Sequence, residues 1–234
     1  MPDPLTPTTL PNALADLTGR DPRLARLLAD YGPPPLWARD PGFPTLVHII
    51  LEQQVSLASA RAAYDKLVAI ASPLTPDRFL ELDDAELRIA GFSRQKTRYG
   101  RELAAAIASG RLDLDRINAL DDEAARDALT RVKGIGRWTA DIYLLLALRR
   151  PDIWPAGDLA LAMAVQRAMG LTAAPAPPEM EAIAEAWRPW RAVAARLLWH
   201  YYLSNRPLTK NRRRKTATAG LAPRRFDTPS LAPV

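Results

Sequence analysis

The chain has 234 residues, of which 48% are hydrophobic, a net charge of +6 and no cysteine, which suits one or two compact domains with a buried core. Without cysteine it can form no disulfide, thiolate zinc site or cysteine-bound iron–sulfur cluster. With no apolar run of about eighteen residues and no signal-peptide pattern, it is expected to be cytoplasmic and to have no membrane partner.

The patterns along the chain predict helices and no strands. Alanine, leucine and arginine dominate, prolines cluster where helices should end, and no alternating strand pattern or hairpin signal is present. The first helix is predicted at 21–31, where Asp21 and Pro22 open it. The polar stretch EQQVS interrupts a helical region at 43–70, and Ser56 is placed to cap a new helix there.

Several further helices follow in the second half of the chain. One begins with Asp158 as its cap and ends at Gly170. The last, at 179–203, is long and contains Pro189, which should kink or divide it. Residues 1–12 and 210–234 show no helical pattern and are predicted to be loose. The remaining predicted helices cover 76–81, 83–90, 94–109, 113–117, 121–132 and 138–149.

The helices at 121–132 and 138–149 are joined by a connection too short to be anything but a tight hairpin, with the sequence Gly134-Ile135-Gly136. Glycine permits left-handed dihedrals and a close approach of another backbone. The turn exposes the first N–H groups of the second helix, and these groups, with the helix dipole, favour a phosphate oxygen. The spacing alone leaves open both a plain helical hairpin and a nucleic-acid-binding one.

The segment LTRVKGIGRWTADIYLLLALRRPDIWPAGDLAL (129–161) resembles the helix–hairpin–helix (HhH-GPD) DNA glycosylase superfamily, and most closely its bacterial 3-methyladenine DNA glycosylase II branch, the alkylbase DNA glycosylases. Three further stretches carry the same resemblance in the same order: ILEQQVSLASA (50–60), GFSRQKTRYGRELA (91–104) and WRPWRAVAARLLWHYY (187–202). The resemblance implies an all-α fold of two lobes, with the active cleft between them and the hairpin at its mouth. Too few residues precede the first motif for the N-terminal α/β domain that some members carry.

The resemblance also implies a division of the chain. Residues 1–42 are expected to be an N-terminal segment whose helix packs on the C-terminal lobe. Residues 43–150 are expected to form a helical lobe that ends in the helix–hairpin–helix (121–149). Residues 151–209 are expected to form the C-terminal lobe, which holds the catalytic acid. Residues 210–234 contain seven basic residues and one acidic residue, and are expected to be a disordered basic tail with a polyanion partner or a solubilising role.

Asp158 is the candidate catalytic residue. Its position after Gly157 and before a helical run is typical of an N-cap, which is worth roughly 1 kcal/mol. The resemblance places the family's catalytic aspartate here. The two roles are compatible, because a helix N-terminus favours a negative group, and a fixed carboxylate can stabilise the positive charge that develops on deoxyribose when an N-glycosidic bond breaks.

Trp138 occupies the position where bifunctional members of the superfamily carry the lysine that forms a Schiff base. An indole cannot act as the amine nucleophile. The residue therefore predicts a monofunctional enzyme without AP-lyase activity.

The resemblance matches Trp199 to a base-stacking tryptophan. Trp199 follows Trp190 by nine residues and so faces away from the apolar stripe of the last helix. The same spacing is also expected if Trp199 packs in the core. Stacking returns roughly 1–3 kcal/mol per base, and a cationic base over a ring gains about 0.5–2 kcal/mol more. The other expected pocket residues are Trp138, Ile142 and Tyr143, since isoleucine stands where the family has a second aromatic.

DNA contacts are expected from the hairpin and from the EQQVS stretch. The residue that fills the gap left by the everted base is matched to Gln54, with Gln53 beside it. The resemblance implies a bound Na⁺ or K⁺ on the carbonyl groups of Thr130, Val132 and Ile135, and no other cofactor. The residues expected to contact DNA are Lys133, Gly134, Ile135, Gly136, Arg137 and Thr139.

These features together predict a monofunctional DNA glycosylase of base excision repair. It is expected to evert and remove alkylated bases such as 3-methyladenine and 7-methylguanine, leaving an abasic site. The expected partner is double-stranded DNA that contains alkylated bases, in association with the nucleoid, and no protein partner is predicted. The main alternative is a non-catalytic helix–hairpin–helix DNA-binding protein, and a third reading is oxidised-base repair with strand nicking.

Overall fold

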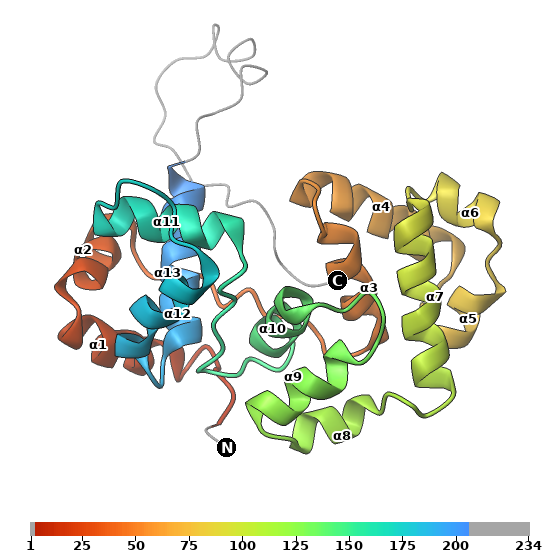
Figure 1. The fold of residues 1–234 in the computed structure, drawn as a ribbon, viewed down its shortest axis with the longest axis horizontal. Coiled ribbons are helices and arrows are strands. Elements are labelled where there is room, and N and C mark those ends of the chain that lie inside the picture. Colours follow the sequence, from red (N-terminus) through yellow and green to blue (C-terminus); the bar gives the residue numbers. More distant parts are fainter. Residues whose placement is uncertain (1–2, 206–234) are drawn as a thin grey trace, which may run out of the picture.

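A computed structural model describes residues 3–205, and within this range every regular element is a helix (Figure 1). The predicted all-α class is therefore confirmed. The basic tail lies outside the described residues. The elements are α1 (Leu10–Arg20), α2 (Pro22–Tyr31), α3 (Phe43–Glu52), α4 (Leu57–Ile70), α5 (Pro76–Glu81), α6 (Asp84–Ile89), α7 (Arg94–Ala108), α8 (Leu114–Ala119), α9 (Asp122–Thr130), α10 (Arg137–Leu146), α11 (Leu159–Met169), α12 (Pro177–Ala184), the 3₁₀ turn η1 (Glu185–Trp187) and α13 (Arg191–Ser204).

The helices gather in two groups on either side of α10 (Figure 1). One group combines both ends of the described chain, because α1 and α2 pack against α13, and α11 packs against α13 and α2. The other is continuous in sequence, with α3 packed on α4 and α7, and α5 on α7. Helix α10 contacts α9 and α3. No helix among residues 3–205 is long and apolar enough to cross a bilayer.

Helix α1 was not predicted. Residues 1–12 were expected to be loose, but Leu5 is buried and α1 begins at Leu10. Proline at the first turn of a helix removes no hydrogen bond, so the Pro-rich start does not prevent α1. Its buried face, formed by Leu10, Leu14 and Leu17, repeats at helical spacing and packs against α2 and α13.

The two predicted interruptions are present. Helix α3 ends at Glu52, and the hydroxyl of Ser56 accepts a hydrogen bond from the N–H of Ser59 (3.2 Å), which caps α4. The last predicted helix is divided into α12, η1 and α13, and Pro189 lies between the last two. Proline lacks the N–H that a continuous helix would need at that point.

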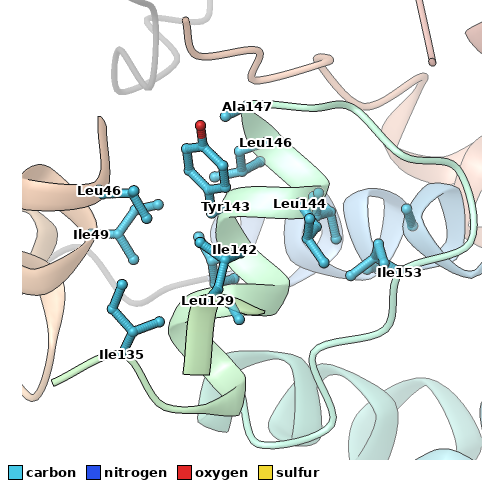
Figure 2. Close-up of a cluster of buried hydrophobic side chains, with 14 of the residues drawn as sticks. Leu46, Ile49, Leu129, Ile135, Ile142, Tyr143, Leu144, Leu146, Ala147 and Ile153 are labelled. Carbon is cyan, nitrogen blue, oxygen red and sulfur yellow. The ribbon is translucent and has the colours of Figure 1, made fainter. Parts of the chain in front are cut away.

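Helix α10 is the central element of the core. All its residues from Thr139 to Leu146 are buried. Figure 2 shows its side chains among those of α3, α9 and the hairpin. This packing places the hairpin against α3 and α9 and so positions the site described below. The labelled members of the cluster are Leu46, Ile49, Leu129, Ile135, Ile142, Tyr143, Leu144, Leu146, Ala147 and Ile153.

A fully buried arginine ties three segments together near the same place. The guanidinium of Arg196 donates hydrogen bonds to the carbonyl oxygens of Leu36 (2.9 Å), Leu145 (2.7 Å) and Ala192 (3.0 Å). Burial lowers the pKa of Arg196 to about 9. The contacts link the loop before α3 to α10 and α13, and all three segments contribute to the cavity described next.

Candidate active site

The hairpin between α9 and α10 depends on Gly134. Its φ of +100° lies in the region that favours glycine, and a Cβ added there would lie 2.3 Å from Cγ of Tyr99. The second glycine, Gly136, is the N-cap of α10 and provides no side-chain cap. The first N–H groups of α10 are therefore left without a side-chain acceptor, as an anion site at a helix N-terminus requires.

A groove of about 1050 Å³ runs along the hairpin. It lies between the hairpin, the loop after α3 and the start of α11, and Tyr99 lines it from α7. Arg137, which was expected to contact DNA, does not line the groove. Its guanidinium lies 3.2 Å from Glu181 and 3.9 Å from Asp141 instead. The other residues expected there all line it: Lys133, Gly134, Ile135, Gly136 and Thr139.

The structure gives different positions to the two glutamines of EQQVS. Gln54 is exposed in the groove, in the left-handed backbone region (φ 58°). The amide of Gln53 turns inward and donates hydrogen bonds to the carbonyl oxygen of Gly134 (3.0 Å) and to Oγ1 of Thr139 (3.0 Å). Gln53 therefore braces the loop against the hairpin, and Gln54 is the one that projects.

The three residues whose carbonyl groups are matched to a monovalent cation lie together at the hairpin. Thr130, Val132 and Ile135 all line the groove. Within the described part of the chain, the carbonyl of Val132 accepts a hydrogen bond from Ile135 (3.0 Å), whereas no such bond reaches the carbonyls of Thr130 or Ile135. Oxygen donors of this kind suit a hard cation.

Asp158 is both a helix cap and a cavity residue. One carboxylate oxygen, Oδ1, accepts hydrogen bonds from the N–H of Leu161 (2.7 Å) and from Nε1 of Trp199 (3.1 Å). The other, Oδ2, accepts one from Nε1 of Trp138 (2.9 Å). Two indoles and a helix N-terminus thus surround the carboxylate with hydrogen-bond donors.

Asp158 lies where the groove meets a second, deeper cavity of about 310 Å³. Trp138, Ile142 and Trp199 line this cavity, as expected for a base pocket. Tyr143 does not, and its predicted position was wrong. It is fully buried, and its hydroxyl accepts a hydrogen bond from the N–H of Gly42 (3.0 Å). One residue along a helix is a rotation of about 100°. Ile142 therefore reaches the cavity, whereas Tyr143, which Figure 2 shows within the buried cluster, does not.

Several cavity residues were missed by sequence reasoning. Tyr202 and Leu203 were detectable, because they follow Trp199 by three and four residues and so share its helix face. No sequence pattern indicated Trp37, because it lies in an irregular loop without helical spacing. Both Trp37 (φ 48°) and Gln54 are non-glycine residues with left-handed backbones, a strained conformation that is concentrated at functional sites.

A buried ion pair also lines the cavity. The guanidinium of Arg39 contacts the carboxylate of Glu52 through two bonds of 2.7 and 3.1 Å. The two side chains are 9% and 6% exposed, and both line the cavity. Behind them His48 stacks on Tyr64. Burial lowers the pKa of His48 to about 4, so its imidazole is neutral at pH 7.

Comparison with known proteins identifies relatives of this chain in sequence and in fold. The family model for HhH-GPD superfamily base excision DNA repair proteins matches residues 47–190. DNA-3-methyladenine glycosylase 1 of Schizosaccharomyces pombe is 29% identical over 82% of this chain and 87% of its own length. The solved structure of 3-methyladenine DNA glycosylase from S. pombe in complex with abasic DNA superposes with a TM-score of 0.74, at 28% identity over 80% of this chain and 95% of that one. DNA-3-methyladenine glycosidase from Bacillus halodurans gives 0.69, at 28% identity over 81% and 88%.

Proposed function

This chain belongs to the HhH-GPD superfamily of base excision DNA repair proteins, in its alkylbase DNA glycosylase branch, and from that premise we propose that it is a monofunctional 3-methyladenine DNA glycosylase. The observation that carries the proposal is the position of Asp158. Its carboxylate lies where a groove that suits a DNA backbone meets a cavity lined by tryptophan. A protein that only binds DNA has no need of an acid at that junction.

The proposed reaction is hydrolysis of the bond between C1′ of deoxyribose and the base nitrogen. The target nucleotide leaves the stack, and its base enters the cavity beside Trp199. As the bond breaks, its electron pair goes to the base, and positive charge develops on the sugar, which Asp158 stabilises. Water adds to C1′ and loses a proton, leaving an abasic site. A methylated cationic base departs as a neutral molecule, so no second acid is needed to protonate it.

The hairpin would hold the DNA backbone. The unpaired N–H groups at the start of α10 and the ammonium of Lys133 are the donors for phosphate oxygens. The carbonyls of Thr130, Val132 and Ile135 would hold Na⁺ or K⁺, which supplies positive charge for a phosphate. Gln54 would enter the duplex where the base had been, because it projects from the loop beside the cavity.

The proposal of a monofunctional enzyme rests on Trp138. Its indole nitrogen donates to Asp158 (2.9 Å) and cannot form a Schiff base. The chemistry at this site is therefore carried by water and one carboxylate.

The test is incubation with methylated duplex DNA, followed by chromatography of the free bases and gel analysis of the strand. We expect 3-methyladenine and 7-methylguanine to be released, with strand breaks only after alkaline treatment. Binding to duplex without any release would favour the non-catalytic DNA-binding alternative. A covalent adduct trapped by borohydride would favour a lyase instead.

A further inference from the structure

The cavity contains more charge than the proposed reaction uses. Among its described lining residues the charged side chains are Asp158, Arg39 and Glu52. Asp158 accepts hydrogen bonds from both Trp138 and Trp199 and so engages these two indoles. The Arg39–Glu52 pair is the other charged group that lines the cavity.

Folding alone does not account for this pair. Desolvating two buried charges generally offsets their attraction, and apolar replacements are often neutral or stabilising. Glu52 is also the last residue of α3, where a carboxylate faces the negative end of the helix dipole. The six residues from Leu46 to Leu51 are otherwise apolar apart from His48. Apolar residues at both positions would continue that pattern without any charge to compensate.

The geometry of the pair leaves the carboxylate able to accept more hydrogen bonds. Arg39 uses one nitrogen for each oxygen of Glu52, through bonds of 2.7 and 3.1 Å. A carboxylate oxygen has two acceptor directions. Nε2 of His48 is 3.8 Å from Oε1 of Glu52, beyond hydrogen-bond distance. Each oxygen therefore retains a free acceptor direction.

The two hydroxyl groups that line the cavity are already engaged. The hydroxyl of Ser56 caps α4 and contacts Oγ of Ser59 (2.9 Å). The hydroxyl of Tyr202 is directed at the sulfur of Met163 (4.0 Å). Glu52 is therefore better placed than either hydroxyl to accept a hydrogen bond from the edge of a base.

We propose that Glu52, oriented by Arg39, selects everted bases that carry an amino group at C6 of a purine or C4 of a pyrimidine, such as methylated adenines and cytosines, over bases with an oxygen at the same position. This inference rests on the proposed glycosylase function and names the substrate class of that site. An amino group donates a hydrogen bond to the carboxylate. A carbonyl oxygen there would place its lone pairs against a negative charge. Sites built around a buried polar partner discriminate strongly against analogues that leave it unpaired.

The test compares two bases released in one reaction. Methylated DNA supplies 3-methyladenine, with an amino group at C6, and 7-methylguanine, with an oxygen at C6. The Glu52→Gln variant keeps the shape but adds an amide N–H that can donate to an oxygen. We expect the ratio of the initial release rates, 3-methyladenine to 7-methylguanine, to fall about tenfold or more relative to wild type.

A matched control is Asp122→Asn. It weakens the ion pair of Asp122 with the buried Arg150 (2.8 Å), and neither residue lines the cavity or the groove. This variant should retain the wild-type ratio. If Glu52→Gln does not fold, Arg39→Gln combined with Glu52→Gln removes both charges together and is expected to lower the ratio likewise.

The outcomes separate the two levels of the proposal. An unchanged ratio in the Glu52 variants, or an equal slowing of both bases, would show that the pair is structural and would overturn the inference while the glycosylase function stands. Failure of the wild-type protein to release either base would overturn the proposed function, and this inference with it.

Discussion

Replacing Asp158 with asparagine separates its two roles. The cap can survive, because an amide oxygen can still accept the 2.7 Å bond from the N–H of Leu161. The charge is lost, and the new amide N–H would face the indole N–H of Trp138, now 2.9 Å from Oδ2. We therefore expect the free energy of unfolding to fall by about 1–2 kcal/mol, from one lost hydrogen bond to a charged group.

The effect on catalysis should be larger. A unit negative charge about 4 Å from a developing positive charge is worth on the order of 4 kcal/mol at an effective dielectric constant near 20, which corresponds to a rate change of roughly 10³-fold. Single-turnover release of 7-methylguanine measures the rate, urea unfolding measures stability, and a duplex containing an abasic site measures binding. A variant that retains activity within tenfold of wild type would show that Asp158 is only a cap, and would refute the proposed mechanism.

Three other variants test contacts elsewhere in the structure. Gln54→Gly removes the projecting side chain and relieves a left-handed backbone, so excision from duplex DNA should slow while the free energy of unfolding stays equal or rises by up to about 1 kcal/mol. Gln53→Ala removes two hydrogen bonds to the hairpin and should lower the free energy of unfolding by about 1–3 kcal/mol. Equal free energies of unfolding for the two variants would contradict these assignments. Burial would raise the pKa of Asp21, but hydrogen bonds from Arg23 and Trp187 outweigh it and lower this pKa to about 2. The stability that Asp21 provides is therefore complete above about pH 4 and lost as pH falls toward 2. In urea unfolding, the difference between wild type and Asp21→Asn should shrink over that range, and a constant difference would contradict the account.

Local signals in the sequence account for much of the fold and part of the site. The helix breaks at EQQVS and Pro189, the cap at Asp158 and the glycine hairpin all depend on residues within one or two turns of each other, so spacing and capping rules identify them. Helical periodicity also placed Trp199 on the face opposite the apolar stripe, where the cavity lies. Helix α1 was not predicted, because prolines obscured its short apolar repeat.

Tertiary packing decided what spacing could not. Only the folded chain brings Arg39 to Glu52, turns Gln53 toward the hairpin while Gln54 projects, and places Trp37 in the cavity. Tyr143 and Ile142 are adjacent in sequence, yet the helices that surround α10 determine that one is core and the other lines the cavity. A sequence pattern records how residues repeat along one helix. The partner that each face meets is set by elements distant in the chain, and no local rule contains that information.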